Sequence, residues 1–340
     1  MNVYDGIHWN IYDVLPYQRN FNLINSERSI GKTFTTLFYF IDKCITKKLE
    51  FVYITRTKEE KQENALEKAV SKVINLKFPN YIFNFNNEYF SLENEVIGRC
   101  IALSEAHKIK KNSYPAVKYM IFDEYCLEEN AKKFYVNGFK EPDLLLNIYH
   151  TIDREEDRVI CFLLGNNIKF YNPYHIHPAF SIPKIEKGTI WTSENVLFQN
   201  AVSSTELKNK KSSSKFVNMI KNTDYGNYAY NGNYLDDNES FIHSLTPNSK
   251  YFCTLSYLND DYAVYCDYKL GILIISNKID PYCKFNFALT LSDHKENTLL
   301  TKSARFTHLE FIKKNFKLGN IRFENMLIKS KIENGIALLL

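Results

Sequence analysis

The stretch that decides the fold is FNLINSERSIGKT, residues 21–33. A short apolar run leads into a loop that ends in Gly31, Lys32 and Thr33, and a segment readable as a helix follows. Such loops bind phosphates through backbone N–H groups, with a lysine for the β- and γ-phosphates and a hydroxyl for Mg²⁺. Ser26 replaces the first glycine of the usual pattern, which is tolerable where φ is negative. The stretch predicts a phosphate-binding loop, although so short a motif also arises by chance.

A second motif, MIFDE at residues 120–124, favours the same interpretation. An apolar and aromatic run that reads as a buried strand ends in two adjacent carboxylates, Asp123 and Glu124. ATPases with such a loop place an acid at the end of a neighbouring parallel strand, where it holds the Mg²⁺ shell. We assign that role to Asp123 and expect Glu124 to polarise the attacking water. The alternative is a pair of acids that merely ends a strand in solvent.

Polar and basic residues around a later apolar run, DRVICFLLGNN at 157–167, are further candidates. Asn166 ends this predicted strand, where a polar side chain can sense the γ-phosphate; a turn-forming Asn pair is the alternative. Arg154 and Arg158 lie at its start. An arginine that reaches a neighbouring subunit's nucleotide stabilises the charge of the transferring phosphoryl group. The alternative is two surface arginines paired with the acids beside them.

The order of elements indicates an α/β protein with a parallel-rich sheet. Continuous apolar runs predict buried strands, and helical segments alternate with them, as in sheets covered on both faces. We expect strands at 50–57, 118–125 and 157–167, a β-ribbon at 81–103 and a helix at 141–152. After a polar stretch, three strand-like runs between 250 and 290 and a helix ended by Gly319 predict a smaller α+β domain. The predicted division is an ATPase domain at 1–195, a linker region at 196–245 and a C-terminal domain at 246–340.

Composition excludes several other classes of protein. The 340 residues are 45% hydrophobic and 24% charged, with a formal net charge of +4, which is an ordinary globular balance that permits contact with nucleic acid. The 7 cysteines form no C-x-x-C pair and no Cys/His zinc spacing. No secretory signal is visible, and no apolar run approaches the roughly 20 residues needed to span a bilayer. We expect a soluble, cytoplasmic protein.

Four quoted segments together resemble a known family. SERSIGKT, FVYITRTK, SYPAVKYMIFDEY and LLLNIYHTIDREEDRVICFLLGNNIKFYNPY are similar to the DNA-packaging (encapsidation) ATPases of phi29-like podoviruses, and GILIISNKIDP extends the resemblance toward the C-terminus. The resemblance implies a phage of a low-GC Gram-positive host. It implies an ASCE-type P-loop ATPase domain followed by an RNase H-like domain that has lost nuclease activity.

The resemblance also implies the working context. The chain would form a ring, a pentamer, docked on the portal vertex of the procapsid in the cytoplasm of the bacterial host. ATP and Mg²⁺ would be its cofactors, and double-stranded viral DNA and the portal protein its partners, with a packaging RNA as a further candidate. A terminase-type ATPase with an active metal-dependent nuclease is the alternative function, and a nucleotide-binding scaffold without turnover is another.

Site residues follow from matching these motifs position by position. The expected nucleotide-binding residues are Ser26, Glu27, Arg28, Ser29, Ile30, Gly31, Lys32 and Thr33. Thr33 and Asp123 are the expected metal ligands, and the expected catalytic residues are Glu124, Arg154, Lys32 and Asn166, with Arg158 as the second choice for the trans-acting arginine. A translocase must ignore sequence, so it should grip DNA phosphates through basic residues. The expected DNA contacts are Arg56, Lys58, Lys110, Lys111, Lys132 and Lys133, with Lys108, Lys208, Lys210, Lys211 and Lys215 as weaker candidates.

Three carboxylates of the C-terminal domain leave two interpretations open. RNase H-like nucleases need clustered acids to hold two metal ions, and Asp267, Asp280 and Asp293 are the candidates for such a remnant. Asp280 before a proline is equally typical of a turn, and Asp293 after a serine is typical of a helix start. The family resemblance favours loss of cleavage.

Overall fold

The computed structural model describes residues 6–127, 135–136, 138–234, 239–300 and 307–339. The chain forms two compact units, residues 1–236 and 237–340, which are described separately below. In the described part of the chain, no helix has the length and apolar character required to cross a membrane.

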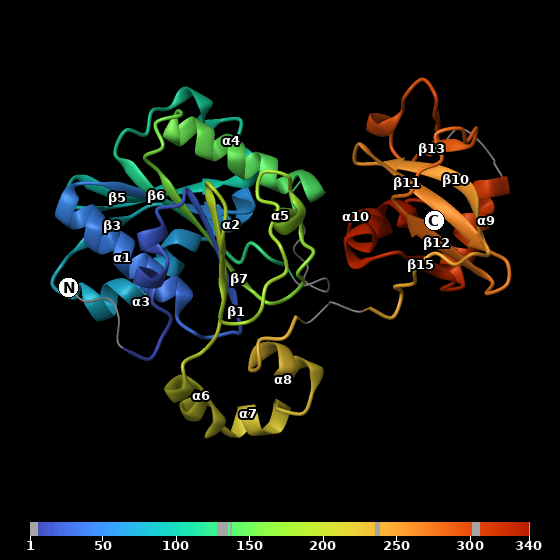
Figure 1. The fold of residues 1–340 in the computed structure, drawn as a ribbon. Coiled ribbons are helices and arrows are strands. Elements are labelled where there is room, and N and C mark those ends of the chain that lie inside the picture. The colour runs from blue at the N-terminus through green and yellow to red at the C-terminus, as the bar shows by residue number, and fades with distance from the viewer. Residues whose placement is uncertain (1–5, 128–134, 137, 235–238, 301–306, 340) are drawn as a thin grey trace. The chain divides into compact units, whose positions relative to one another are not determined.

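The first unit is built on a nine-stranded sheet in the order β3-β4-β5-β2-β6-β7-β1-β9-β8 (Figure 1). Its strands are β1 (Phe21–Ser26), β2 (Glu50–Thr55), β3 (Phe83–Phe85), β4 (Tyr89–Leu92), β5 (Glu95–Ala102), β6 (Val117–Asp123), β7 (Ile160–Asn166), β8 (Ile190–Thr192) and β9 (Val196–Ala201). The six strands from β5 to β9 in this order are parallel, as predicted. β7 lies between β1, which precedes the loop, and β6, which ends in the acids. This insertion is the ASCE arrangement that the family resemblance implied.

Helices cover both faces of this sheet. They are α1 (Lys32–Lys47), α2 (Lys58–Gln62), α3 (Ala65–Lys77), α4 (Glu141–Asp153) and α5 (Pro173–Ile176). Neighbouring residues of β1 point to opposite faces: Ile24 packs with α1 and α3, whereas Leu23 packs with α4 and α5. Apolar burial on both faces explains why the central strands are continuous apolar runs. The carboxyl ends of β1, β6 and β7 therefore meet at one edge of a well-packed sheet.

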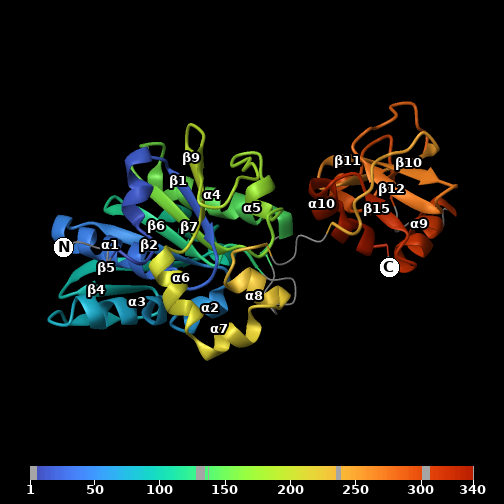
Figure 2. The ribbon, with the colours of Figure 1, turned by 60° about the horizontal axis from the view of Figure 1, so that its bottom comes forward.

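The predicted linker region at 196–245 begins within this sheet. β9 pairs with β1 along its whole length, from Phe21 opposite Val196 to Ser26 opposite Ala201. Three short helices follow, α6 (Thr205–Ser212), α7 (Lys215–Ile220) and α8 (Asp224–Ala229), which Figure 2 shows as a consecutive yellow group. The first unit extends to residue 236, so the boundary lies 41 residues beyond the predicted end of the ATPase domain at 195. The polar composition of this stretch reflects short, mostly exposed helices and not an unstructured linker.

The second unit is the predicted small RNase H-like α+β domain. Its six-stranded sheet has the order β14-β13-β10-β11-β12-β15. The strands are β10 (Ser249–Tyr257), β11 (Asp260–Asp267), β12 (Ile272–Ser276), β13 (Asn286–Ala288), β14 (Leu299–Leu300) and β15 (Ile321–Phe323). β10, β11 and β12 form an antiparallel meander, and β13 joins β10 in parallel. Helices α9 (Thr307–Lys317) and α10 (Met326–Ala337) contribute Ile312 and Ile332 to its core.

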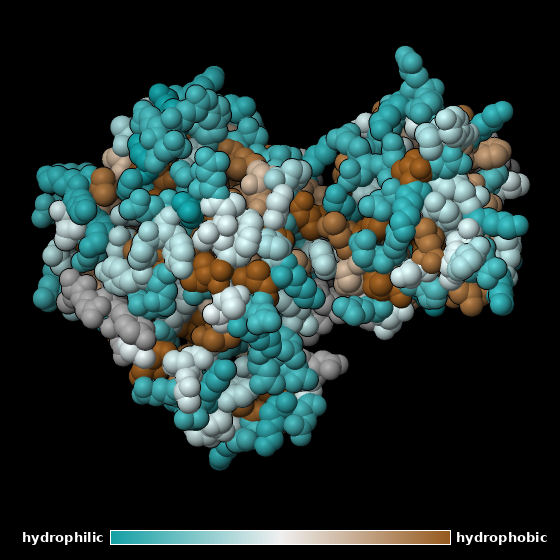
Figure 3. Space-filling view, in the orientation of Figure 1, coloured by the Kyte–Doolittle hydropathy of each residue, from teal (hydrophilic) through white to brown (hydrophobic). Residues whose placement is uncertain are grey.

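The visible surface of each unit is mainly hydrophilic, with small separate hydrophobic areas (Figure 3). This is the distribution expected when large apolar side chains fill the interior.

Candidate active site

The phosphate-binding loop lies between the end of β1 and the start of α1. Ser26 is the last residue of β1 and pairs with Asn166 of β7 and Ala201 of β9. The left-handed residues of the loop are Ser29, with φ 63°, and Gly31, with φ 91°, whereas Ser26 has no positive φ. A serine at the first position is therefore compatible with the loop, because only a positive φ strongly favours glycine.

Lys32, the first residue of α1, is buried under the loop with a relative exposure of 7%. Its Nζ donates to the Oγ of Ser26 and lies 3.4 Å from the Oδ1 of Asn166. Burial lowers the pKa of Lys32 to about 8, and the nearby Asp123 carboxylate opposes that shift. An anion placed beside this ammonium would favour its charged form. The predicted loop lysine and the predicted sensing residue thus occupy one site.

Thr33 and Asp123, the predicted metal ligands, are in direct contact. The Oγ1 of Thr33 donates to the Oδ2 of Asp123 over 2.9 Å. Burial raises the pKa of Asp123 to about 6, while the hydrogen bond from Thr33 opposes the rise. Hydroxyl and carboxylate oxygens are the hard ligands that Mg²⁺ prefers, and Mg²⁺ usually takes one or two protein carboxylates together with phosphate oxygens.

Glu124 follows directly and is exposed, with a left-handed backbone at φ 56°. A cleft of about 360 Å³ is lined by residues 28–34 of the loop and α1, by Asp123 and Glu124, and by residues 164–166 of β7. The carboxylate of Glu124 thus lies at the same cleft as Lys32 and Thr33. A carboxylate in this place can act on a water molecule next to a bound phosphate.

The N-terminal segment packs against the loop and leaves little room for a side chain at Gly31. The backbone N–H of Trp9 donates to the carbonyl of Ile30 over 2.8 Å. A Cβ added at Gly31 would lie 3.0 Å from the Cβ of His8, a closer approach than nearly all real Cβ contacts. With its left-handed φ, Gly31 is required for both conformation and space. The backbone loop, the lysine and the hydroxyl–carboxylate pair together fit the triphosphate of a nucleotide with Mg²⁺.

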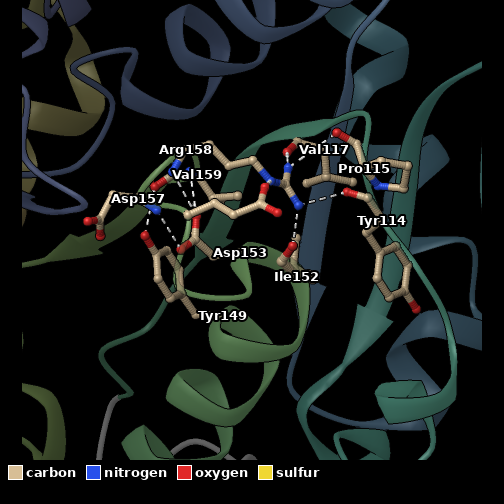
Figure 4. Close-up of polar contacts among 10 residues, drawn as sticks. Tyr114, Pro115, Val117, Tyr149, Ile152, Asp153, Asp157, Arg158 and Val159 are labelled. Atoms are coloured by element: carbon tan, nitrogen blue, oxygen red, sulfur yellow. Dashed lines mark hydrogen bonds and ion pairs between the residues drawn. The ribbon is translucent and has the colours of Figure 1, made fainter.

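The two candidate arginines have different environments. Arg154 follows α4 directly and is exposed, with one hydrogen bond of 3.3 Å from its guanidinium to the carbonyl of Asn112. The guanidinium of Arg158 instead donates to backbone carbonyls of its own chain, among them those of Tyr114 and Ile152 (Figure 4). The guanidinium of Arg158 is thus already hydrogen bonded within its own unit. Arg154 remains the candidate that can reach another molecule.

Arg56, predicted to contact DNA, is buried instead, with an exposure of 3%. Its Nε donates to both carboxylate oxygens of Glu141, which has an exposure of 0%, over 3.0 and 3.1 Å. Its terminal nitrogens donate to the carbonyls of Glu124, over 3.1 Å, and Tyr125, over 2.9 Å. The DNA assignment is therefore wrong for this arginine in the structure described, because the charge is neutralised by a buried partner and cannot reach a phosphate.

The other predicted DNA contacts divide into exposed residues and residues outside the described chain. Lys58 is exposed at the start of α2, and Lys110 and Lys111 are exposed on a 3-10 turn, Ile109–Lys111. These three stay predictions. Lys132 and Lys133 lie outside the described residues.

Several loop residues are held by the segment after β9, which the sequence did not indicate. Glu27, expected to bind nucleotide, is buried, and its Oε1 accepts from the N–H of Ser203 over 2.7 Å. The Nε of Arg28 donates to the hydroxyl of Tyr228 over 3.1 Å, and the Nζ of Lys211 donates to the carbonyl of Arg28 over 2.7 Å. Lys211, a weaker DNA candidate, is thus a support of the phosphate-binding loop.

The three carboxylates singled out in the second unit accept hydrogen bonds from backbone and side-chain groups of that unit. The Oδ1 of Asp267 accepts from the N–H groups of Lys269 and Leu270, each over 3.0 Å, and the hydroxyl of Thr246 holds its pKa below the ordinary value. The Oδ1 of Asp280 accepts from the N–H of Tyr282 over 3.0 Å. Asp293 is buried, and its Oδ1 accepts from the N–H of Asn259 over 2.9 Å. Within the described residues, no group of three or more His, Cys, Asp or Glu side chains could hold a metal ion.

Comparison with known proteins gives a consistent result over nearly the whole chain. A family model described as podovirus DNA encapsidation protein (Gp16) matches residues 3–336. The DNA packaging protein of Bacillus phage phi29 is 27% identical over 328 residues, covering 96% of each chain. The DNA packaging protein of Bacillus phage B103 is 27% identical over 321 residues, covering 93% of this chain and 96% of that relative. Among solved structures, a chain of the bacteriophage phi29 viral genome packaging motor assembly is 25% identical with a TM-score of 0.75, covering 98% of this chain and 100% of that one.

Proposed function

This chain belongs to the podovirus DNA encapsidation protein family and packages viral DNA, and we propose that it does so as a motor driven by ATP hydrolysis. The observation that carries the proposal is the convergence of Lys32, Thr33, Asp123 and Asn166 at the carboxyl ends of three adjacent strands. A phosphate loop, a metal-binding acid and a sensing amide at one cleft are the parts that nucleotide hydrolysis requires.

The residues divide the work as follows. The loop backbone and Lys32 bind the β- and γ-phosphates, and Thr33 with Asp123 would hold Mg²⁺. The ion, when bound, neutralises negative charge on the phosphate oxygens. Glu124 orients and deprotonates the attacking water. Asn166, at the end of β7, senses the γ-phosphate. The support for these roles is that each side chain lies at the cleft.

We infer that the chain acts as a homo-oligomeric ring, a pentamer, in which Arg154 completes the site of the next subunit. The support is that Arg154 is exposed, whereas Arg158 is bonded within its own chain. The ring would dock on the portal protein of the procapsid in the host cytoplasm and grip double-stranded DNA. Lys58, Lys110 and Lys111 are the exposed candidates for contacts with phosphates. A packaging RNA is a further candidate partner.

The test is ATP turnover by the assembled ring with and without double-stranded DNA. We expect DNA to stimulate hydrolysis, and Lys32→Ala to abolish nucleotide binding and turnover together, because it removes the buried charge that faces the phosphates. Glu155→Gln, which changes an exposed carboxylate away from the cleft, is the control. ATP binding without any turnover in the native ring would reject the motor and favour a nucleotide-binding scaffold.

The trans role of Arg154 is tested by mixing subunits. Rings of Arg154→Ala subunits and rings of Glu124→Gln subunits should each be inactive, because the first lack the arginine and the second the base. Mixed rings should regain part of the turnover, since some interfaces combine an intact Glu124 with an intact neighbouring Arg154. Mixed rings as inactive as their parents would show that the arginine does not act across the interface.

A further inference from the structure

The loop after α4 has an unusual backbone. Arg154, Glu155 and Asp157 have φ values of 56°, 62° and 51°. Left-handed conformations are uncommon for residues other than glycine, and they persist only where surrounding groups hold them. Three such residues among four consecutive positions indicate a loop that its surroundings fix in one shape.

The carboxylate of Asp153 holds this loop from inside. Asp153 is the last residue of α4 and is buried, with an exposure of 2%. Its Oδ1 accepts from the N–H groups of Arg158 and Val159, both over 2.9 Å, and its Oδ2 accepts from the N–H of Asp157 over 3.0 Å. Hydrogen bonds to an ionised acceptor are the strong ones, so three of them define the path of the backbone.

The guanidinium of Arg158 holds the same loop from the other side (Figure 4). It donates to the carbonyl of Ile152 near the end of α4, to that of Tyr114 over 3.1 Å, and to that of Val117 at the start of β6. Arginine is suited to this because its five N–H groups lie in one rigid plane. The loop is thereby attached to α4 and to the segment that leads into the acidic strand.

A third attachment connects the end of the loop to the strand of the phosphate-binding loop. The hydroxyl of Tyr149 donates to the carbonyl of Val159 over 2.9 Å and accepts from the Nδ2 of Asn20 over 2.9 Å. Asn20 directly precedes β1. The loop is therefore fixed to the same sheet that carries the candidate active site.

Arg154 is the residue that this fixed loop presents. Its N–H donates to the carbonyl of His150 over 2.9 Å, so its backbone is part of the end of α4. Its side chain is exposed and makes one hydrogen bond of 3.3 Å with the carbonyl of Asn112. Its backbone is thus held by hydrogen bonds of α4 and the loop, and its exposed side chain starts from a fixed position.

We propose that Asp153 and Arg158 are positioning residues, which preform this loop so that Arg154 meets the neighbouring subunit's nucleotide without a further ordering step. The proposal rests on the trans role of Arg154 given above. Its physical basis is that a group held in place before binding avoids the entropy cost of being ordered, and that small displacements of such a group cost large factors in rate.

The experiment compares Asp153→Asn with Glu155→Gln, a matched loss of charge on an exposed carboxylate of the same loop. We expect Asp153→Asn to lower the turnover number of DNA-stimulated rings by about tenfold to a hundredfold, with nucleotide affinity close to native. The thermal midpoint should fall, because an amide cannot accept all three of the backbone N–H groups that the buried carboxylate accepts. Glu155→Gln should leave all three unchanged.

A second variant, Arg158→Lys, keeps the charge but removes the planar set of donors. It should show the same fall in turnover with native nucleotide affinity, and it keeps the proposal testable if Asp153→Asn folds poorly. Native turnover in both variants, or a loss of nucleotide affinity as large as the loss of turnover, would overturn the positioning role. Native turnover of Arg154→Ala itself would instead reject the trans arginine on which the proposal rests.

Discussion

The acidic residues singled out in the two units have different surroundings. In the first unit, the carboxylate of Asp123 bonds a hydroxyl at the phosphate-binding loop, and Glu124 is exposed at the same cleft. In the second unit, the carboxylate oxygens of Asp267 and Asp293 accept hydrogen bonds from backbone N–H groups and hydroxyls of the same unit. The Oδ1 of Asp123 also accepts a backbone N–H, that of Glu124, over 3.1 Å. The comparison teaches that internal hydrogen bonds do not separate the two sets of acids, and that an acid becomes a candidate for chemistry when it lies at a cleft beside groups that can bind a ligand.

The largest expected effect concerns the acids at the cleft of the first unit. Glu124→Gln should lower ATP turnover by roughly a hundredfold to ten-thousandfold, because an amide cannot accept the proton of the attacking water. Steady-state hydrolysis by DNA-stimulated rings measures it. Asp267→Asn should leave turnover unchanged, and a comparable loss in that variant would remove the distinction between the two sets of acids.

A smaller effect is expected at the hydroxyl that faces Asp123. Thr33→Val should weaken Mg²⁺-dependent ATP binding by roughly tenfold to a hundredfold, because it removes a hydrogen-bonding group next to a charged carboxylate. Calorimetric titration with and without Mg²⁺ measures this. Thr33→Ser retains the hydroxyl and should bind nearly as the native chain does. Equal weakening with and without the metal would mean that the hydroxyl does not serve the ion.

For the acids of the second unit, we expect substitution to change the stability of the fold and not ATP turnover. Asp293→Ala should destabilise the second unit by about 1–3 kcal/mol, because it leaves the N–H of Asn259 and the hydroxyl of Thr290 without their acceptor. Asp280→Ala, in an exposed turn, should change stability by less than about 0.5 kcal/mol. Denaturant unfolding measures both. Equal effects would argue against a specific role for the Asp293 carboxylate.

The expected effect that is smallest at neutral pH is a pH dependence of the first unit. Burial lowers the pKa of His175 to about 3, and its Nε2 lies 2.6 Å from the hydroxyl of Tyr125, directly after Glu124. Since the unfolded chain binds the proton near pH 6.5 and the folded chain does not, stability falls as pH drops from 6.5 toward 3. The contribution is up to about 1.4 kcal/mol per pH unit.

Unfolding measured across that range in the native chain and in His175→Asn isolates this contribution. The variant should show a shallower loss of stability on acidification, because it has no group to protonate at this position. Parallel stability curves for the two proteins would contradict the assignment.

The sequence was sufficient to predict the candidate active-site residues that belong to short local motifs. The loop residues Lys32 and Thr33 and the strand-end residues Asp123, Glu124 and Asn166 lie at one cleft, because parallel strands bring their carboxyl ends to the same edge. Each of these residues was visible from its own neighbours in the chain.

The residues whose roles depend on distant partners were not predictable in this way. Arg56 carries the same charge as an exposed DNA contact, but its partner Glu141 lies 85 residues further along and buries it. Lys211 supports the loop at Arg28 across 183 residues. The domain boundary was predicted too early, at 195, because a polar stretch follows β9. The boundary depends on the pairing of β9 with β1 and not on the local abundance of polar residues.

The position of β1 in the sheet affects how the chain folds while it is synthesised on the ribosome. The strand that carries the phosphate-binding loop is among the first segments made, yet both of its neighbours, β7 and β9, are made more than a hundred residues later. At ordinary rates of synthesis the loop waits roughly ten to thirty seconds before its strand can be enclosed. During that interval β1 lacks both of the strands with which it pairs, so the phosphate-binding loop cannot reach its folded geometry until residues 160–201 have left the exit tunnel.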